Sequence, residues 1–181
     1  PARPCLVYGH SVGGQLVLNR ALTQPDGIDA VLVTAPWLRL AFPAPALRVL
    51  IGRTLCGVLP ALTLPSGLET AALSRDPEVV AAYRADPLVH DRLSTRFGID
   101  LLDEGQRALD RAGGLSLPVL LMHGSEDRII DPEATRQFFE RAGSADKRLR
   151  IWPGLYHEIH NEPEWESVLQ ESTGWALSHA G

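Results

Sequence analysis

Three polar residues that lie far apart in the sequence, Ser11, Asp127 and His157, are of the types that together perform nucleophilic catalysis. A serine hydroxyl is a weak nucleophile at neutral pH, and it becomes reactive when a histidine accepts its proton. The histidine needs a carboxylate that fixes its tautomer and stabilises the charge it acquires. Each of the three residues follows an apolar run. We therefore interpret them as a candidate nucleophile, acid and base for acyl transfer.

The serine lies at the centre of a Gly-x-Ser-x-Gly segment between an apolar run at 5–8 and a helical pattern at 15–22. In a strand–turn–helix of this kind the serine occupies a strained turn, and small neighbours let the strand approach the helix. We expect Gly9 and Gly13 to provide that space. The Val12 backbone N–H at the helix start would then stabilise a developing oxyanion. The alternative is a glycine-rich turn with an incidental serine.

Other histidines and a second aspartate compete for these roles. His160 is an alternative base, and Asp131 is an alternative acid, although its position before a proline predicts a helix cap. His10 is expected to pack with its side chain turned away from the serine. His123 is expected to be a hydrogen-bonded strand histidine. His90 is expected to be a surface or packing residue, with the lining of a pocket as its alternative.

The apolar runs that precede the candidate residues predict buried parallel strands. Strand, helix and strand alternate along the chain, which favours a parallel sheet with helices on its faces. Loops at the carboxyl ends of such strands gather at one edge, where active sites form. The charges at 148–152 place the last strand near a sheet edge. The expected strands are 5–8, 28–33, 118–124 and 148–152, and the expected helices are 15–22, 101–112, 131–142 and 164–178.

Residues 37–98 differ from the rest, because prolines recur and no strand pattern appears. We expect one helix from Pro45 to Leu59 and a second that starts at Asp76-Pro77. The chain would then consist of core residues 1–35, a helical insertion at 36–100 and core residues 101–181. The apolar side of the insertion would either guide a greasy substrate or simply pack on the core.

The composition is that of a globular protein: 45% of the 181 residues are hydrophobic, 22% are charged, and the formal net charge is −5. Basic residues are dispersed, so a nucleic-acid partner is not expected. The longest apolar region, 44–64, is broken by two arginines and a proline and predicts no membrane span. Cys5 and Cys56 form no disulfide framework, and Cys5 is expected to lie buried in the first strand. We expect a cytoplasmic location.

Three segments resemble the monoacylglycerol lipase and lysophospholipase branch of the α/β-hydrolases, a serine aminopeptidase S33-like group. They are GHSVGG at 9–14, LMHGSEDR at 121–128 and GLYHEIHNE at 154–162, with SRDP at 74–77 and ADPLV at 85–89 matching that branch's cap. The resemblance implies the C-terminal part of an α/β-hydrolase fold, a mostly parallel sheet flanked by helices with a helical cap insertion.

The resemblance also implies roles for single residues: Ser11 as nucleophile, Asp127 as acid, His157 as base and the Val12 N–H as one oxyanion donor. The implied reaction is hydrolysis of a carboxylic ester, such as a monoacylglycerol or lysophospholipid, without metal or cofactor. Transient membrane or micelle contact through the cap is also implied. The family has methionine where Val12 stands, which changes little because the donor is backbone.

Alternatives to the esterase remain open. An aminopeptidase or an acyltransferase would use the same three residues, and a non-catalytic relative would act as a binding module. Enzymes with a carboxylate nucleophile are disfavoured because serine stands at position 11. The chain starts with Pro1 and has a single methionine. We therefore expect it to be part of a longer sequence whose N-terminal region carries the second oxyanion donor. Loss of one such donor costs roughly 100-fold in rate or more, so we expect this chain alone to be poorly stable and weakly active or inactive, and the longer parent protein to be an esterase.

Overall fold

The computed structural model describes residues 4–43 and 46–180. Four parallel strands form the main sheet in the order β1-β2-β5-β6. The parallel sheet and the edge position of the last strand are confirmed. The strands are β1 (Leu6–His10), β2 (Ala30–Thr34), β5 (Val119–Gly124) and β6 (Lys147–Trp152).

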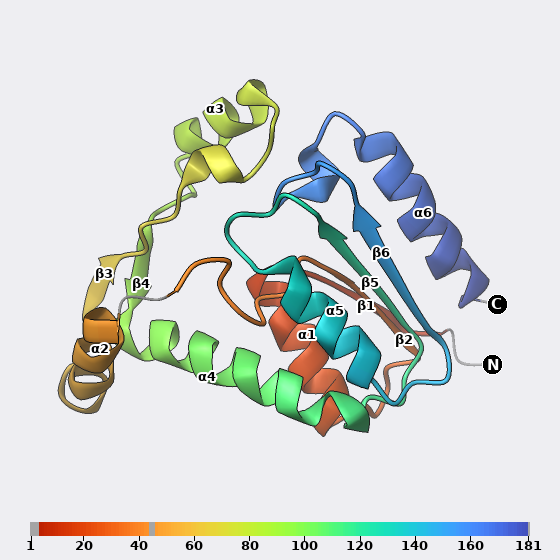
Figure 1. Cartoon of the computed structure of the whole chain (residues 1–181), viewed down its shortest axis with the longest axis horizontal. Coiled ribbons are helices and arrows are strands. Elements are labelled where there is room, and N and C mark those ends of the chain that lie inside the picture. Colours follow the sequence, from red (N-terminus) through yellow and green to blue (C-terminus); the bar gives the residue numbers. More distant parts are fainter. Residues whose placement is uncertain (1–3, 44–45, 181) are drawn as a thin grey trace.

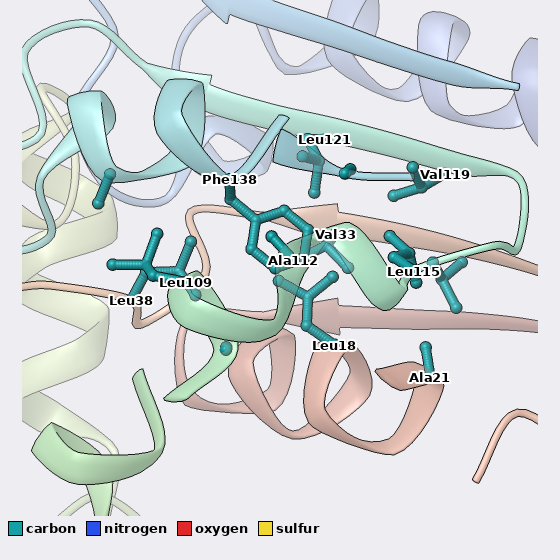
Figure 2. Packing of buried hydrophobic residues seen from close by; sticks show 14 residues of the cluster. Leu18, Ala21, Val33, Leu38, Leu109, Ala112, Leu115, Val119, Leu121 and Phe138 are labelled. Carbon is teal, nitrogen blue, oxygen red and sulfur yellow. The ribbon is translucent and has the colours of Figure 1, made fainter. Parts of the chain in front are cut away.

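Three helices cover one face of the sheet: α1 (Val12–Thr23), α4 (Thr95–Arg111) and α5 (Pro132–Arg141). Figure 2 shows the apolar cluster between them and the strands. Alternate residues of the central strands face this cluster, as the twofold period of a strand requires. Its members include Leu18, Val31, Val33, Leu109, Val119, Leu121 and Phe138.

The opposite face of the sheet packs against α6 (Trp165–Ser178) (Figure 1). Here the other set of strand residues, including Leu32 and Met122, contacts Val168 and Trp175 of the helix. Because both faces are covered, every residue of β2 and β5 is buried. This explains why those strands appear in the sequence as continuous apolar runs.

Residues 46–94, called the inserted segment below, lie apart from the sheet in Figure 1. The inserted segment contains a two-stranded antiparallel pair, in which Leu64 lies opposite Leu93. The sequence did not predict this pair. Each strand has three residues, too few to show an alternating pattern. The expected position of Pro45 in a helix lies outside the described residues. The elements are α2 (Ala46–Val58), β3 (Thr63–Pro65), η1 (Thr70–Ala72), α3 (Pro77–Ala85) and β4 (Arg92–Ser94).

Helix α4 begins six residues earlier than expected, at Thr95 rather than 101. The Ser94 hydroxyl caps it by accepting a hydrogen bond from the Phe97 N–H at 3.2 Å. The helix continues without a break past residue 100. It therefore joins the inserted segment rigidly to the face of the sheet.

The Asp76 cap of α3 is confirmed, since its carboxylate accepts from the Glu78 N–H at 2.8 Å.

Strand β1 is less buried than its apolar sequence predicts. Among the described residues it pairs only with β2, so one of its edges has no neighbouring strand. Tyr8 is 54% exposed. The prediction that Cys5 lies buried in this strand is wrong: Cys5 precedes the strand and is exposed.

The close approach between β1 and α1 depends on Gly9 and Gly14. A Cβ at Gly9 would lie 2.5 Å from the Gly13 carbonyl oxygen, and one at Gly14 would lie 2.8 Å from Val33. A Cβ at Gly13 would have no atom within 4 Å. The prediction that Gly13 must be small is therefore wrong, because its backbone approaches Gly9 while its own Cβ position faces open space.

These contacts predict opposite outcomes for two matched substitutions. Gly9→Ala should lower the free energy of unfolding by about 1–3 kcal/mol, because backbone must move to relieve the clash. Gly13→Ala should leave it unchanged or raise it by up to about 1 kcal/mol, since alanine is favoured in a helix. Urea denaturation of both variants checks this, and equal stabilities would contradict it.

Candidate active site

Ser11 occupies a strained turn between β1 and α1. Its φ of 52° and ψ of −118° lie in a region that non-glycine residues rarely adopt. Three backbone hydrogen bonds hold this conformation: the Ser11 N–H donates to Thr34 at 3.0 Å, and the Ser11 carbonyl accepts from Gln15 at 3.1 Å and Trp37 at 3.0 Å. Strain persists where the surroundings over-determine the backbone, as they do here.

The structure brings Ser11, Asp127 and His157 together in one line of hydrogen bonds. The Ser11 Oγ lies 3.0 Å from the His157 Nε2, and the His157 Nδ1 lies 2.7 Å from the Asp127 Oδ2. With an ionised carboxylate as acceptor, Nδ1 carries the ring proton and Nε2 accepts from the serine hydroxyl. This is the geometry in which a histidine can remove a serine proton.

The Asp127 side chain is fully buried, and its carboxylate has four hydrogen-bond donors. Its Oδ1 accepts from the backbone N–H groups of Ile129 at 2.8 Å and Ile130 at 3.0 Å, and its Oδ2 accepts from His157 and His123. Burial alone would raise the pKa of Asp127, but the hydrogen bonds from the two histidines outweigh it and hold the pKa well below its usual value. The group is therefore an anion at neutral pH.

The loops that carry Asp127 and His157 are joined to each other. The Glu126 N–H donates to the Leu155 carbonyl at 3.0 Å. Gly124 lets them approach, because a Cβ there would collide with the carbonyl oxygens of Leu155 and Tyr156. These contacts fix the aspartate and the histidine in one rigid unit at the sheet edge.

A buried glutamate, Glu162, connects the same unit to the inserted segment. Its Oε1 accepts from the Tyr156 N–H at 2.8 Å, and its Oε2 accepts from the Arg75 Nε at 2.8 Å. The Glu158 N–H also donates to the Leu73 carbonyl at 2.8 Å. Glu162 is 1% exposed. The sequence analysis gave this residue no role of its own, although it lies within a segment that carries the resemblance.

The expectation that His10 turns away from the site is wrong. Its ring centroid lies 4.8 Å from that of His157 and 4.7 Å from that of His160, and its Nδ1 contacts the Thr34 hydroxyl at 2.9 Å. The loop after β6 must cross the ends of the strands to reach Ser11, and there it meets His10. Burial, followed by the neighbouring His157 and His160, lowers the pKa of His10 to about 3. His10 is therefore neutral at physiological pH.

The other residues that compete for the catalytic roles lie as follows. Asp131 caps α5 by accepting from the Glu133 N–H at 2.9 Å, as predicted. His123 is fully buried and hydrogen bonded, as predicted, but its contact with Asp127 was missed. The available signal was the short spacing of four residues between His123 and Asp127. His90, expected at the surface or in packing, lines the cavity described next.

A cavity of about 750 Å³ adjoins the serine. Ser11, Val12 and His157 line one end of it, and the inserted segment and α4 supply most of the remaining wall. A mainly apolar cavity with polar groups converging at one end suits a ligand with a long apolar part. The apolar lining includes Val49, Leu64, Leu68, Leu73, Leu93 and Ile99.

Helix α2 does not pack its apolar face on the core. Leu47 is 68% exposed, and Leu50, Ile51 and Val58 are also exposed.

Within residues 4–43 and 46–180, no helix combines the length and apolar character needed to cross a bilayer. In the same described ranges, no three His, Cys, Asp or Glu side chains are grouped as a metal ion would require.

The sequence matches a known family over most of its length. The profile described as "Serine aminopeptidase, S33" matches residues 1–164. A monoacylglycerol lipase of Mycolicibacterium smegmatis is 37% identical over 99% of this chain and 64% of its own length. The phospholipase YtpA of Bacillus subtilis is 30% identical over 92% of this chain and 65% of its own length. The chain thus spans about two thirds or less of these relatives.

The fold matches a solved structure closely. The crystal structure of a Paleococcus ferrophilus monoacylglycerol lipase superposes with a TM-score of 0.92 at 37% identity, over 97% of this chain and 69% of the other. The α/β-hydrolase fold expected from the resemblance is therefore confirmed.

The Glu162 contacts predict unequal effects for two neighbouring glutamates. Glu162→Ala should lower the free energy of unfolding by about 1–3 kcal/mol, because it leaves buried N–H donors without acceptors. Glu164→Ala removes an exposed partner of the same Arg75 and should cost less than about 1 kcal/mol. Chemical denaturation measures both. A larger loss for Glu164→Ala would contradict the assignment of Glu162 as the main link.

The lowered pKa of His10 predicts a pH dependence of stability. The unfolded chain binds a proton at this residue near pH 6.5, whereas the folded chain binds it only near pH 3. The contribution of neutral His10 to the free energy of unfolding is therefore complete above about pH 6.5 and is lost as the pH falls toward 3. His10→Gln should flatten part of this slope, because His160, whose pKa burial also lowers, and the carboxylates of Asp127 and Asp103, whose pKa values are lowered, contribute other parts. Denaturation at several pH values tests it; an unchanged slope would count against a buried neutral His10.

Proposed function

The chain belongs to the serine aminopeptidase S33 family, and on that premise we propose that it hydrolyses carboxylic esters of lipids through an acyl-enzyme on Ser11. The observation that carries the proposal is the hydrogen-bonded line from Ser11 through His157 to Asp127 beside an apolar cavity. Such a line activates a hydroxyl, and the cavity gives the hydroxyl an apolar substrate to act on.

In the proposed reaction, the His157 Nε2 accepts the Ser11 proton as Oγ attacks the ester carbonyl carbon. The oxyanion that forms faces the Val12 N–H at the start of α1, where the helix dipole also favours negative charge. Asp127 stabilises the imidazolium meanwhile. The alcohol leaves with the proton from His157. A water molecule, deprotonated by the same Nε2, then attacks the acyl-enzyme and releases the carboxylic acid.

The substrate class that we propose is an ester with one acyl chain, a monoacylglycerol or a lysophospholipid. Its support is the cavity beside Ser11, together with relatives named as a monoacylglycerol lipase and a phospholipase. The inserted segment would act as a cap over the site. The exposed apolar side chains of α2, Leu47 and Leu50 among them, would contact a membrane or micelle transiently.

Two other functions remain as alternatives. An aminopeptidase would need an acidic group to hold the substrate amine, and Glu69 and Glu158 line the cavity. An acyltransferase would differ only in the acceptor of the acyl group.

The two cysteines are free thiols, which suits a reducing compartment, so the proposal keeps a cytoplasmic location.

The proposal predicts that a fluorophosphonate probe labels the wild-type chain and that Ser11→Ala abolishes labelling. His157→Gln should slow labelling at least 100-fold, because the hydroxyl loses its base. Ser172→Ala, on α6 and away from the site, is the matched control and should label normally.

The substrate class is tested with p-nitrophenyl esters of increasing chain length against aminoacyl p-nitroanilides. Turnover of the esters, lost in Ser11→Ala, is expected. Preferential cleavage of the anilides would favour the aminopeptidase. Absence of both labelling and activity in a full-length protein that contains this chain would favour the binding module.

A further inference from the structure

One buried titratable residue at the site takes no part in the proposed reaction. The His123 Nε2 lies 2.9 Å from the Asp127 Oδ2, the same oxygen that the His157 Nδ1 contacts at 2.7 Å. His123 is at the end of β5 and is fully buried. One carboxylate oxygen therefore receives two imidazole N–H groups.

The second ring nitrogen of His123 is also bound. Its Nδ1 lies 2.8 Å from the Thr135 hydroxyl, which α5 places there and which is itself buried. A neutral ring that accepts the Thr135 proton at Nδ1 must carry its own proton on Nε2. The ionised Asp127 carboxylate only accepts, so it selects the tautomer with the proton on Nε2, and the Thr135 hydroxyl donates to Nδ1 and holds the ring in place.

We propose that His123 is a positioning residue, which keeps the Asp127 Oδ2 directed at His157 and takes a share of its negative charge. This inference rests on the reaction proposed above, in which His157 alone transfers protons. The Oδ1 atom is occupied by two backbone N–H groups, so the carboxylate cannot rotate freely. The donor from His123 then competes with His157 for the remaining oxygen.

The hydrogen bond from His123 takes up part of the negative charge on the Asp127 Oδ2. Less of that charge is then available to stabilise a positive charge on the His157 ring. An anion held by His157 alone would stabilise the imidazolium more strongly and raise the pH at which the base gains its proton. The base would then return its proton to the alcohol less readily. The other titratable groups facing this line are His10, His160 and Glu158. The His10 ring lies against those of His157 and His160, and the charge of Glu158 acts on His160.

Three variants separate this role from simple core packing. His123→Leu with Thr135→Val removes both partners at once and leaves no buried hydroxyl unpaired. His123→Gln keeps an amide N–H for Asp127 and an amide oxygen for Thr135. Met122→Leu is the matched control, since Met122 precedes His123 in β5, is equally buried and packs toward the opposite face.

The main readout is the titration of the His157 ring by NMR in the full 181-residue chain, assigned with His157→Gln. We expect the double variant to raise the His157 midpoint by about half a unit to one pH unit. His123→Gln and Met122→Leu should titrate as the wild type. The acid limb of fluorophosphonate labelling of Ser11 should shift with the NMR midpoint. An unchanged or lowered midpoint in a folded double variant would overturn the proposal.

Thr135 gives a second test should the double variant fail to fold. Thr135→Val alone removes the hydrogen-bond partner that holds the His123 ring at Nδ1 and should give a smaller upward shift, whereas Thr135→Ser keeps the hydroxyl and should give none. No shift with Thr135→Val, in that case, counts against the proposal. Absence of labelling in the wild type at every pH would instead refute the hydrolase, and the NMR titration would still decide the role of His123.

Discussion

The geometry of the site depends on the interaction between the buried Asp127 carboxylate and the His157 ring. An anion inside a protein is costly unless donors surround it, and Asp127 has four. Because the two backbone donors come from Ile129 and Ile130, the loop can hold the charge only in one conformation. The position of the His157 ring beside the Ser11 hydroxyl follows from that conformation.

The parallel sheet makes this interaction possible. Ser11, Asp127 and His157 follow β1, β5 and β6, and parallel strands end at the same edge. The order of the strands separates the serine from the histidine by the width of the sheet. The loop after β6 must therefore cross the strand ends, which brings His157 to the serine and also places it against His10. The unanticipated cluster of three histidines is a consequence of topology.

The inserted segment is bound to the site by polar contacts and forms the wall of an apolar cavity. Glu162 joins it to the His157 loop through Arg75, and the continuous helix α4 joins it to the face of the sheet. The inserted segment and the His157 loop are therefore parts of one connected structure, and a displacement of the inserted segment would act on the loop that holds His157.

The sequence alone determined the parallel strands, the strained serine turn, the helix caps at Asp76 and Asp131 and the three candidate residues, because strand runs, caps and tight turns depend on nearby residues. Only the tertiary structure decided which side chains meet: His123 on Asp127, three histidines in contact, and Glu162 on the inserted segment. The contacts among the histidines and of Glu162 join positions that are adjacent only after loops cross the sheet edge, and the contact of His123 with Asp127 depends on how the loop after β5 folds back. No local periodicity records them, since they depend on the order of strands and the path of the chain.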